Sequence, residues 1–418
     1  MKRVAFKTVG CRLNQAETAR MAAGLQAAGY GIVPYGEACE IGVVHTCTIT
    51  AQAARDSVRI ARAWKRQAAP PLVILAGCAV ELEPERLLRE SGADLAVRQA
   101  DKFRLAELLA GADPGRSNPS PSAGGVAAAP LFETTRALIH VQDGCDFRCA
   151  YCVVPLARHA PTSRPFDDIL DEVRRLGDQG YREVVLTGAN LGCYRDGARG
   201  LVELLAAVEA VEAVRRMRVS SIELSTVERG LVDFMQSSAK FCRQLHLPLQ
   251  SGDDGVLRAM GRRYTACAYR EAVAYALERI PLLGLGADVL VGFPGEDERA
   301  FENTVALVRE LPFSNLHVFP YSRRPGTPAA ARADQVPDRE KKRRVRLLTA
   351  LRDEKRSALA ARHIGRPVEV LVERLCGDGA GRGWTGEYVE AVVRSAGVAV
   401  NDIVTCTPDS AVEGVLYA

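Results

Sequence analysis

The sequence lacks a long uncharged apolar run. Its 418 residues contain no window of 18 or more apolar residues free of charge, and a shorter stretch does not span the hydrocarbon core of a bilayer as a helix. The start, MKRVAFKTVGC, turns polar before the apolar region of a secretory signal develops. We therefore expect a cytoplasmic protein in a reducing compartment, without a membrane anchor.

The sequence also lacks a strong excess of one charge. Its net charge is +4, from 55 basic and 51 acidic residues, which is too small to indicate nucleic-acid binding by itself. Residues 366–418 contain four arginines and eight acidic residues, so this part is near −4 and the rest near +8. The basic residues are densest in REKKRRVR (Arg339–Arg346), within a helix predicted from Asp338 to His363. This segment is either a solvated helix face or a contact for RNA phosphates.

Cysteine, in contrast, is plentiful. Twelve cysteines in a reducing compartment argue against a disulfide framework and for metal, cluster or catalytic thiols. The stretch DGCDFRCAYCVVP places Cys145, Cys149 and Cys152 at spacings of four and three. Three thiolates can hold three corners of a four-iron cluster and leave one iron open for a small molecule. A zinc site with His159 as fourth ligand and a chance set of structural cysteines are the alternatives.

The chain divides at a segment that cannot form a core. Sixteen of the twenty residues in Gly111–Pro130 are Gly, Pro, Ser or Ala, which is typical of a linker. Before it, strand-like runs (VAFKTVG, IGVVHT, LVILAG) alternate with helical patterns, which predicts a parallel sheet with helices on both faces. Asn14 and Glu17 predict a capping box at the first helix.

After the linker the alternation resumes with six predicted strands. We expect a (β/α)6 partial TIM barrel from ALIHVQ, EVVLTG, MRVSSIE, QLHLPLQ, GADVLVGF and NLHVFPYS. From Gly365, short alternating runs separated by glycines predict a small antiparallel β-barrel. The predicted fold is therefore a multidomain α/β protein. Its predicted parts are residues 1–112, a linker at 113–130, residues 131–363 and residues 364–418.

A second set of cysteines lies in the first predicted domain. Cys11, Cys47 and Cys78 each follow a predicted strand, and open parallel sheets bind ligands at the carboxyl ends of their strands. The three thiolates could hold a second cluster with one open iron. Alternatively they are buried cysteines that pack as small apolar groups.

The CxxxCxxC motif after the first strand of a (β/α)6 domain resembles the radical S-adenosylmethionine (SAM) superfamily. Nine motifs, in order, resemble its methylthiotransferase family: GCRLNQAE, TCTIT, LAGCAVELEPE, GCDFRCAYCVVPLAR, SRP, VLTGANLGCY, SSIE, LHLPLQSGDDGVLRAMGRRYT and DVLVGFPGE. TCTIT and LTGANLGCY resemble the branch that modifies N6-threonylcarbamoyladenosine at position 37 of tRNA. GWTGEYVEAVV resembles the family's TRAM domain, which presents RNA.

The resemblance implies an enzyme with two [4Fe-4S] clusters and SAM. Cys145, Cys149 and Cys152 would be the catalytic cluster ligands, and Cys11, Cys47 and Cys78 the auxiliary cluster ligands. One SAM would methylate sulfur at the auxiliary cluster, and a second would yield the radical that abstracts hydrogen from C2 of the adenine. The implied partners are the tRNA anticodon stem-loop, an electron donor such as flavodoxin or ferredoxin, and a sulfur source. The enzyme is expected to be a monomer.

The ends of the predicted barrel strands and the resemblance together give candidate SAM contacts, although each could be a hydrogen-bonded structural group instead. These residues are Tyr151, Thr187, Gly188, Asn190, Ser221, Glu223, His246, Gln250 and Asp288. Arg158 and Arg164 could each pair with a carboxylate or phosphate.

The sequence departs from the family pattern in three places. His45 replaces the usual asparagine before the second auxiliary cysteine, and His159 replaces the glycine that usually follows Arg158. The predicted TRAM domain is acidic, which is unexpected for an RNA-binding module.

Two alternative functions stay open. One is the same chemistry on N6-isopentenyladenosine tRNA or a ribosomal-protein aspartate. The other is a noncatalytic iron–sulfur redox or RNA-binding protein.

Overall fold

The computed structural model describes residues 1–111 and 135–418, which form two compact units. The N-terminal unit comprises residues 1–111, Asp143–Phe147 and Cys152–Pro161; the C-terminal unit comprises Thr135–Gln142, Arg148–Tyr151 and Thr162–Ala418. The linker expected at 113–130 lies outside the described residues, so the predicted domain boundaries remain predictions. Among the described residues, no helix has the length and apolar character needed to cross a membrane.

The N-terminal unit contains a five-stranded sheet in the order β2-β1-β3-β4-β5, and every strand pair in it is parallel. The predicted parallel sheet is therefore confirmed. Its strands are β1 (Arg3–Thr8), β2 (Gly31–Val33), β3 (Ile41–Thr46), β4 (Leu72–Gly77) and β5 (Leu95–Val97). Its helices are α1 (Arg12–Ala27), α2 (Ala51–Lys65), α3 (Cys78–Leu82), α4 (Pro84–Ser91), η1 (Lys102–Arg104), α5 (Leu105–Gly111) and α6 (Val154–Arg158).

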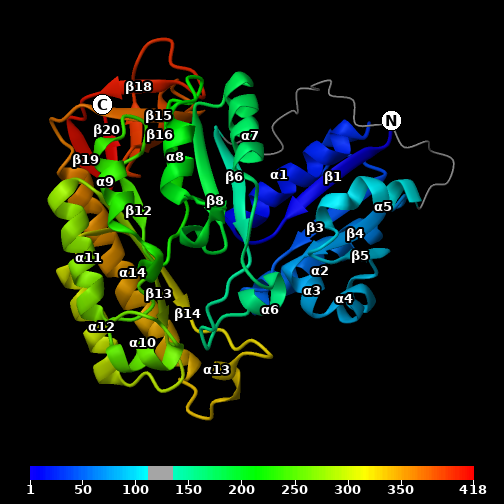
Figure 1. The fold of residues 1–418 in the computed structure, drawn as a ribbon, viewed down its shortest axis with the longest axis horizontal. Helices are drawn as coiled ribbons and strands as arrows, with labels where there is room; N and C mark the ends of the chain where they lie inside the picture. The colour runs from blue at the N-terminus through cyan, green and yellow to red at the C-terminus, as the bar shows by residue number, and fades with distance from the viewer. Residues whose placement is uncertain (112–134) are drawn as a thin grey trace. The chain divides into compact units, whose positions relative to one another are not determined.

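Alternation along the strands builds two apolar layers, one on each face of this sheet. Val4 and Phe6 belong to a buried cluster with Leu25 of α1 and Leu109 of α5. The intervening Ala5 belongs to a second cluster, which includes side chains of α2 and α4. Because successive side chains of a strand point to opposite faces, continuous apolar strands require helices on both sides. Figure 1 shows these helices in blue and cyan around the sheet.

The capping box predicted from Asn14 and Glu17 is wrong. Helix α1 begins at Arg12, with Cys11 as its N-cap residue and no side-chain cap. Asn14 and Glu17 lie inside the helix and are fully buried. The asparagine side chain donates to the carbonyl oxygens of Val9 and Thr46 at 2.9 and 3.1 Å. These contacts to backbone carbonyls before the helix and on β3 replace the local cap that the pattern predicts.

The C-terminal unit contains all six predicted barrel strands, but their hydrogen bonds form two sheets. Parallel pairs join β6 to β8 and β8 to β11 in one sheet, and β12 to β13 and β13 to β14 in the other. Between the sheets, Met217 of β11 forms an isolated bridge with Phe241, and the Ile222 N–H donates to the His246 carbonyl at 3.0 Å. The fold is thus an α/β arrangement whose parallel strands are divided into two sheets between β11 and β12. The strands are β6 (Arg136–Asp143), β8 (Glu183–Gly188), β11 (Arg216–Val219), β12 (Gln244–His246), β13 (Gly284–Val291) and β14 (Phe313–Pro320).

Helices follow these strands in the chain and pack on them around one large apolar core. The main helices are α7 (Phe166–Asp178), α8 (Leu201–Glu209), α9 (Arg229–Ser237), α10 (Asp254–Met260), α11 (Ala266–Arg279), α12 (Glu298–Glu310) and α14 (Asp338–Ala361). The short elements are β7 (Thr162–Ser163), η2 (Leu191–Cys193), β9 (Arg195–Asp196), β10 (Arg199–Gly200), η3 (Leu224–Thr226) and α13 (Pro328–Ala331). Helix α14 confirms the long basic helix expected from Asp338.

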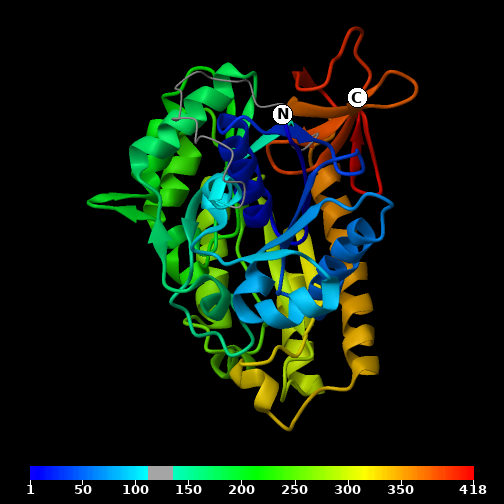
Figure 2. The same ribbon diagram turned by 90° about the vertical axis from the view of Figure 1, so that its right-hand side faces the viewer.

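The last part of the chain is a mixed sheet rather than the antiparallel barrel expected. Its order is β18-β15-β16-β17-β20-β19, and the pair β17–β20 is parallel. Figure 2 shows α14 in orange running toward these red strands, and its residues Leu359 and Ala360 join their core. The strands are β15 (Val368–Leu375), β16 (Gly381–Thr385), β17 (Glu390–Val393), β18 (Ile403–Cys406), β19 (Ser410–Val412) and β20 (Val415–Tyr417).

Candidate functional site

Three cysteines lie at the same edge of the N-terminal sheet. Cys11 follows β1, Cys47 follows β3 and Cys78 follows β4, and these are neighbouring parallel strands. Gly10, with φ of 108°, is so close to Cys47 that a Cβ built on it would lie 2.7 Å from Sγ. All three cysteines are free thiols. The chain therefore brings three soft sulfur donors from three strand ends to one place.

Burial makes two of these thiols, Cys47 and Cys78, dependent on a positive partner. Burial raises the pKa of Cys78 to about 12 and also raises the pKa of Cys47. Because thiolates are the form that binds iron, a bound cation would offset this cost of burial. The donor set and its surroundings fit a cluster held by three cysteines.

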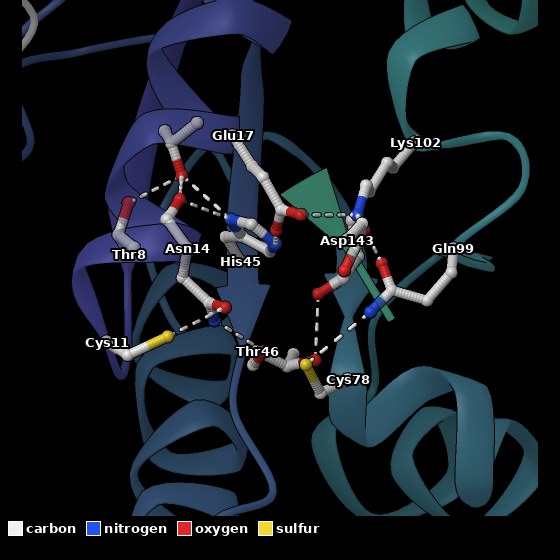
Figure 3. A network of polar contacts seen from close by, with 12 residues as sticks. Thr8, Cys11, Asn14, Glu17, His45, Thr46, Cys78, Gln99, Lys102 and Asp143 are labelled. Atoms are coloured by element: carbon white, nitrogen blue, oxygen red, sulfur yellow. Dashed lines mark hydrogen bonds and ion pairs between the residues drawn. The ribbon is translucent and has the colours of Figure 1, made fainter. Parts of the chain in front are cut away.

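A buried ion network lies beside this cysteine edge (Figure 3). Glu17 accepts hydrogen bonds from Lys102 at 2.6 Å and from both Nη atoms of Arg158 at 2.7 and 2.9 Å. Asp143 accepts from the same two cations at 3.0 and 2.6 Å. Burial raises the pKa of Glu17, but Arg158 and Lys102 more than offset it and hold that pKa well below its usual value. Two carboxylates thus balance two cations.

Arg158 connects this network to the cysteines. Its Nε donates to Cys78 Sγ at 3.2 Å, and its Nη2 donates to Asn14 Oδ1 at 2.7 Å. The Cys11 thiol donates to the same Asn14 oxygen at 3.6 Å, and Gln99 donates to Cys78 Sγ at 3.4 Å. N–H donors to cluster sulfurs stabilise the thiolate and raise the reduction potential of the cluster. The sequence predicts that Arg158 pairs with a carboxylate or a phosphate. In the structure it pairs with the carboxylates of Glu17 and Asp143 and with the sulfur of Cys78.

His45, which replaces the family's usual asparagine, fits inside the N-terminal unit. His45 is fully buried, and its Nδ1 lies 2.8 Å from Thr18 Oγ1 and 3.0 Å from the Asn14 carbonyl. Burial lowers the pKa of His45 to about 4, so the imidazole is neutral. Gly77, with φ of 100°, leaves room for the ring, since a Cβ there would lie 2.5 Å from His45 Cδ2.

The CxxxCxxC cysteines lie on the loop between β6 and α6. In the N-terminal unit, Cys145 donates its N–H to the His159 carbonyl at 3.0 Å, and Cys152 Sγ accepts from the Val154 N–H at 3.4 Å. His159 has φ of 60° and ψ of −155°. This conformation is essentially restricted to glycine, so His159 occupies a backbone conformation that glycine would adopt without strain.

The middle of this loop belongs to the C-terminal unit. Ala150 donates to the Met260 carbonyl and accepts from the Ala329 N–H, both at 2.8 Å. Arg262 donates to Cys149 Sγ at 3.5 Å and also forms a short ion pair with Glu223. Burial raises the pKa of Glu223 despite this arginine. The charged guanidinium of Arg262 therefore lies beside Cys149 of the CxxxCxxC motif.

Several candidate SAM contacts lie at the ends of the strands. Thr187 and Gly188 end β8, and Asn190 follows them. The Asn190 N–H donates to Gln142 Oε1 at 2.8 Å, whereas neither atom of its own buried amide has a hydrogen-bond partner among the described residues. Such an amide is a natural contact for a polar ligand.

The remaining candidates differ in surroundings. Tyr151 packs beside an apolar cluster that contains Met260 and Phe293, and Ser221 is exposed. Gln250 has φ of 64°, and its N–H donates to the carbonyl of Asp288 at 2.8 Å. Arg164 pairs with Glu172 at 2.5 Å. His246 and Asp288 lie together, 3.1 Å apart between Nε2 and Oδ1.

Sequence reasoning missed several residues of these surroundings. Lys102 and Gln99 lie in no motif, and no local signal identifies them. Arg262 lies inside the quoted motif LHLPLQSGDDGVLRAMGRRYT, which could have directed attention to it. His317, which contacts Asp288 at 3.3 Å, also lies outside every quoted motif.

Comparisons with known proteins agree with this arrangement. Residues 3–97 match the model of the uncharacterized protein family UPF0004, and residues 139–308 match that of the radical SAM superfamily. The solved structure of the radical S-adenosylmethionine methyltransferase TsrM from Kitasatospora setae has a TM-score of 0.59 and 16% identity, covering 79% of this chain and 77% of that chain. This likeness shows the fold alone. The class is thus a protein with a UPF0004 domain followed by a radical SAM domain.

Two relatives cover almost the whole chain. Threonylcarbamoyladenosine tRNA methylthiotransferase MtaB of Bacillus subtilis (strain 168) is 32% identical over 422 residues, covering 97% of this chain and 93% of that protein. The tRNA-2-methylthio-N(6)-dimethylallyladenosine synthase of Cereibacter sphaeroides (strain ATCC 17025 / ATH 2.4.3) is 34% identical over 419 residues, covering 96% and 95%. The chain therefore belongs to the radical SAM methylthiotransferase family.

Proposed function

We propose that this chain transfers a methylthio group to C2 of N6-threonylcarbamoyladenosine at position 37 of tRNA. It would use two [4Fe-4S] clusters and two molecules of SAM, one as methyl donor and one as radical source. The observation that carries the proposal is the coexistence of two cysteine triplets in one chain. Three cysteines come from adjacent strand ends, and three come from the CxxxCxxC loop.

The substrate branch is supported by names of relatives. Three relatives that are 32% identical, with 88–97% of this chain covered, carry the name threonylcarbamoyladenosine tRNA methylthiotransferase MtaB. The second candidate is the dimethylallyladenosine branch, because two relatives of that name are 33–34% identical over similar lengths. Identity alone does not separate the two branches. The motifs TCTIT and LTGANLGCY favour threonylcarbamoyladenosine.

Cys11, Cys47 and Cys78 would hold the auxiliary cluster, and Cys145, Cys149 and Cys152 the radical cluster. When bound, the clusters supply electron transfer and an open iron for a ligand. The chain supplies the surroundings: Arg158 and Gln99 orient Cys78 by N–H···S hydrogen bonds.

Seven residues form the proposed SAM site of the C-terminal unit: Tyr151, Thr187, Gly188, Asn190, Ser221, Glu223 and Gln250. The buried amide of Asn190, which lacks a partner among the described side chains, is the strongest candidate for a polar SAM contact. Glu223 is held beside the cluster loop by Arg262. His246 and Asp288, the other two candidates, lie in a cluster with His317.

RNA binding would involve the C-terminal sheet and α14. We assign the sheet of residues 364–418 as the TRAM domain. In α14, Arg343 pairs with Glu298 and buried Arg344 pairs with Glu296. The exposed cations Arg339, Lys342 and Arg346 are spaced three and four residues apart on one face. This face is the proposed contact for tRNA phosphates.

The enzyme would act as a monomer, with an electron donor of the flavodoxin or ferredoxin class and a separate sulfur source. The decisive experiment is an anaerobic reaction of the reconstituted protein with SAM, a reductant and tRNA that carries one modified adenosine. Methylthiolation of threonylcarbamoyladenosine with formation of both S-adenosylhomocysteine and 5′-deoxyadenosine is expected, and Cys145→Ala should abolish it. Reaction only with dimethylallyladenosine tRNA would contradict the branch assignment.

A further inference from the structure

Three neighbouring strands of the C-terminal unit bring two histidines and an aspartate together. His246 ends β12, Asp288 lies in β13 and His317 lies in β14. His246 Nε2 lies 3.1 Å from Asp288 Oδ1, and His317 Nδ1 lies 3.3 Å from the same oxygen. The three potential donor atoms all lie within 4.8 Å of one another. Two imidazoles therefore converge on one carboxylate oxygen.

The strand register explains this convergence. Asp288 is directly paired with His317, and His246 is paired with Gly286, two residues before Asp288. Residues two apart on a strand share a face, so all three side chains lie on the same side of the sheet. A Cβ built on Gly286 would lie 2.6 Å from His246 Nδ1. Glycine at this position therefore leaves the space in which the imidazole approaches Asp288.

The polar atoms of the cluster are incompletely satisfied. His246 is only 8% exposed, and its Nε2 has no hydrogen bond of acceptable geometry to any described residue, although Asp288 is near. Buried polar atoms without partners are uncommon in native structures, and a bound ion is one of the established explanations for them. Both imidazoles face the same carboxylate oxygen of Asp288.

We propose that His246, Asp288 and His317 form a binding site for one divalent transition-metal cation. Two imidazoles and one carboxylate suit Zn²⁺, Fe²⁺ or Mn²⁺. In a tetrahedral site with ordinary bond lengths, donor atoms are about 3.3 Å apart, close to the 3.1 and 3.3 Å observed. The side chain of His317 is 47% exposed and that of Asp288 is 24% exposed, so a coordination position stays open toward solvent for an oxygen ligand. This role differs from the SAM contact predicted for His246 and Asp288.

The alternative is a histidine–aspartate–histidine hydrogen-bond relay without a cation. Manganese(II) separates the two, because it binds nitrogen and oxygen donors, gives an electron paramagnetic resonance (EPR) signal, and competes poorly for thiolates. The experiment titrates Mn²⁺ into the chelator-washed holoenzyme with both clusters oxidised. Free Mn²⁺ is measured by EPR, and the bound ion is examined by electron spin echo modulation for coupling to imidazole ¹⁴N.

The proposal predicts one Mn²⁺ per chain with ¹⁴N coupling from two imidazoles. Asp288→Asn or His317→Gln should weaken binding by at least about 10- to 100-fold, because changing even the outer-shell partners of a ligand costs that much. Gly286→Ala should remove the coupling from His246. Asp338→Asn, which alters a carboxylate whose side chain is 87% exposed, is the matched control and should bind as the parent does. His317→Gln alters a partly exposed residue, so it remains informative if Gly286→Ala does not fold. Equal Mn²⁺ affinity in the parent and His317→Gln, or bound Mn²⁺ without ¹⁴N coupling, would overturn the proposal.

Discussion

Removing the charge of Glu17 tests the ion network beside the auxiliary cysteines. Glu17→Gln keeps the shape of the side chain but leaves Lys102 and Arg158 with Asp143 as their only carboxylate partner in the network. Glu17 is 0% exposed, Lys102 1% and Arg158 6%, so water cannot replace the lost charge. Breaking a buried ion pair in this way typically costs about 3–5 kcal/mol.

The assay is urea unfolding of the N-terminal unit under anaerobic conditions. The chain has two tryptophans, and Trp64 is buried in the N-terminal unit. In a Trp384→Phe background its fluorescence reports on that unit. With a slope of about 1.5 kcal/mol/M, the midpoint should fall by roughly 2–3 M. Glu107→Gln, which removes one member of an exposed pair with Arg104, is the matched control and should change the midpoint little.

Charge balance, rather than the carboxylate itself, should set this stability. Adding Lys102→Met to Glu17→Gln leaves one cation and one carboxylate, so the double variant should recover much of the lost stability. If Glu17→Gln alone is as stable as Glu107→Gln, the buried ion network does not stabilise the N-terminal unit. Further loss of stability in the double variant would refute the balance argument.

Three further predictions concern other parts of the chain. His159→Gly should stabilise the N-terminal unit by about 1–2 kcal/mol in the same unfolding assay, because it relieves a left-handed backbone at φ of 60°; an unchanged midpoint would contradict this. Changing Arg339, Lys342 and Arg346 to glutamine should weaken tRNA binding and lower the slope of log affinity against log salt by about 2–3; an unchanged slope would exclude this face. Burial lowers the pKa of His363, but its glutamate partner and a backbone carbonyl more than offset it, so its pKa is raised in the folded chain. Its stabilisation is therefore complete below the unfolded value of about 6.5 and is lost as pH rises through the folded pKa, so the melting temperatures of the parent and His363→Gln should converge toward pH 8.5. A constant difference from pH 5.5 to 8.5 would contradict this sign.

The sequence predicts features of this protein that depend on strand direction. Cys11, Cys47 and Cys78 could be expected to meet because the carboxyl ends of parallel strands share one edge. All six barrel strands were also predictable from their apolar runs. The division into two sheets was not, because the apolar pattern of β11 and β12 does not encode the weak pairing around Met217.

Local sequence patterns could not predict contacts between residues that are distant in the chain. The Asn14–Glu17 spacing is identical in a capping box and in this buried network, and Arg158, which decides between them, is 141 residues away from Glu17. The parallel pair β17–β20 was equally hidden, since short alternating strands predict no particular partner. His317 joins Asp288 only through the register of β13 and β14.

Methylthiolation of threonylcarbamoyladenosine in tRNA can be tested in cells. Nucleosides from total tRNA of cells lacking this chain are analysed by mass spectrometry, with and without re-expression of the parent or Cys145→Ala. We expect 2-methylthio-N6-threonylcarbamoyladenosine to disappear, to return with the parent, and to stay absent with Cys145→Ala. An unchanged level of this nucleoside in the cells that lack the chain, or its return with Cys145→Ala, would show that the proposed function is wrong.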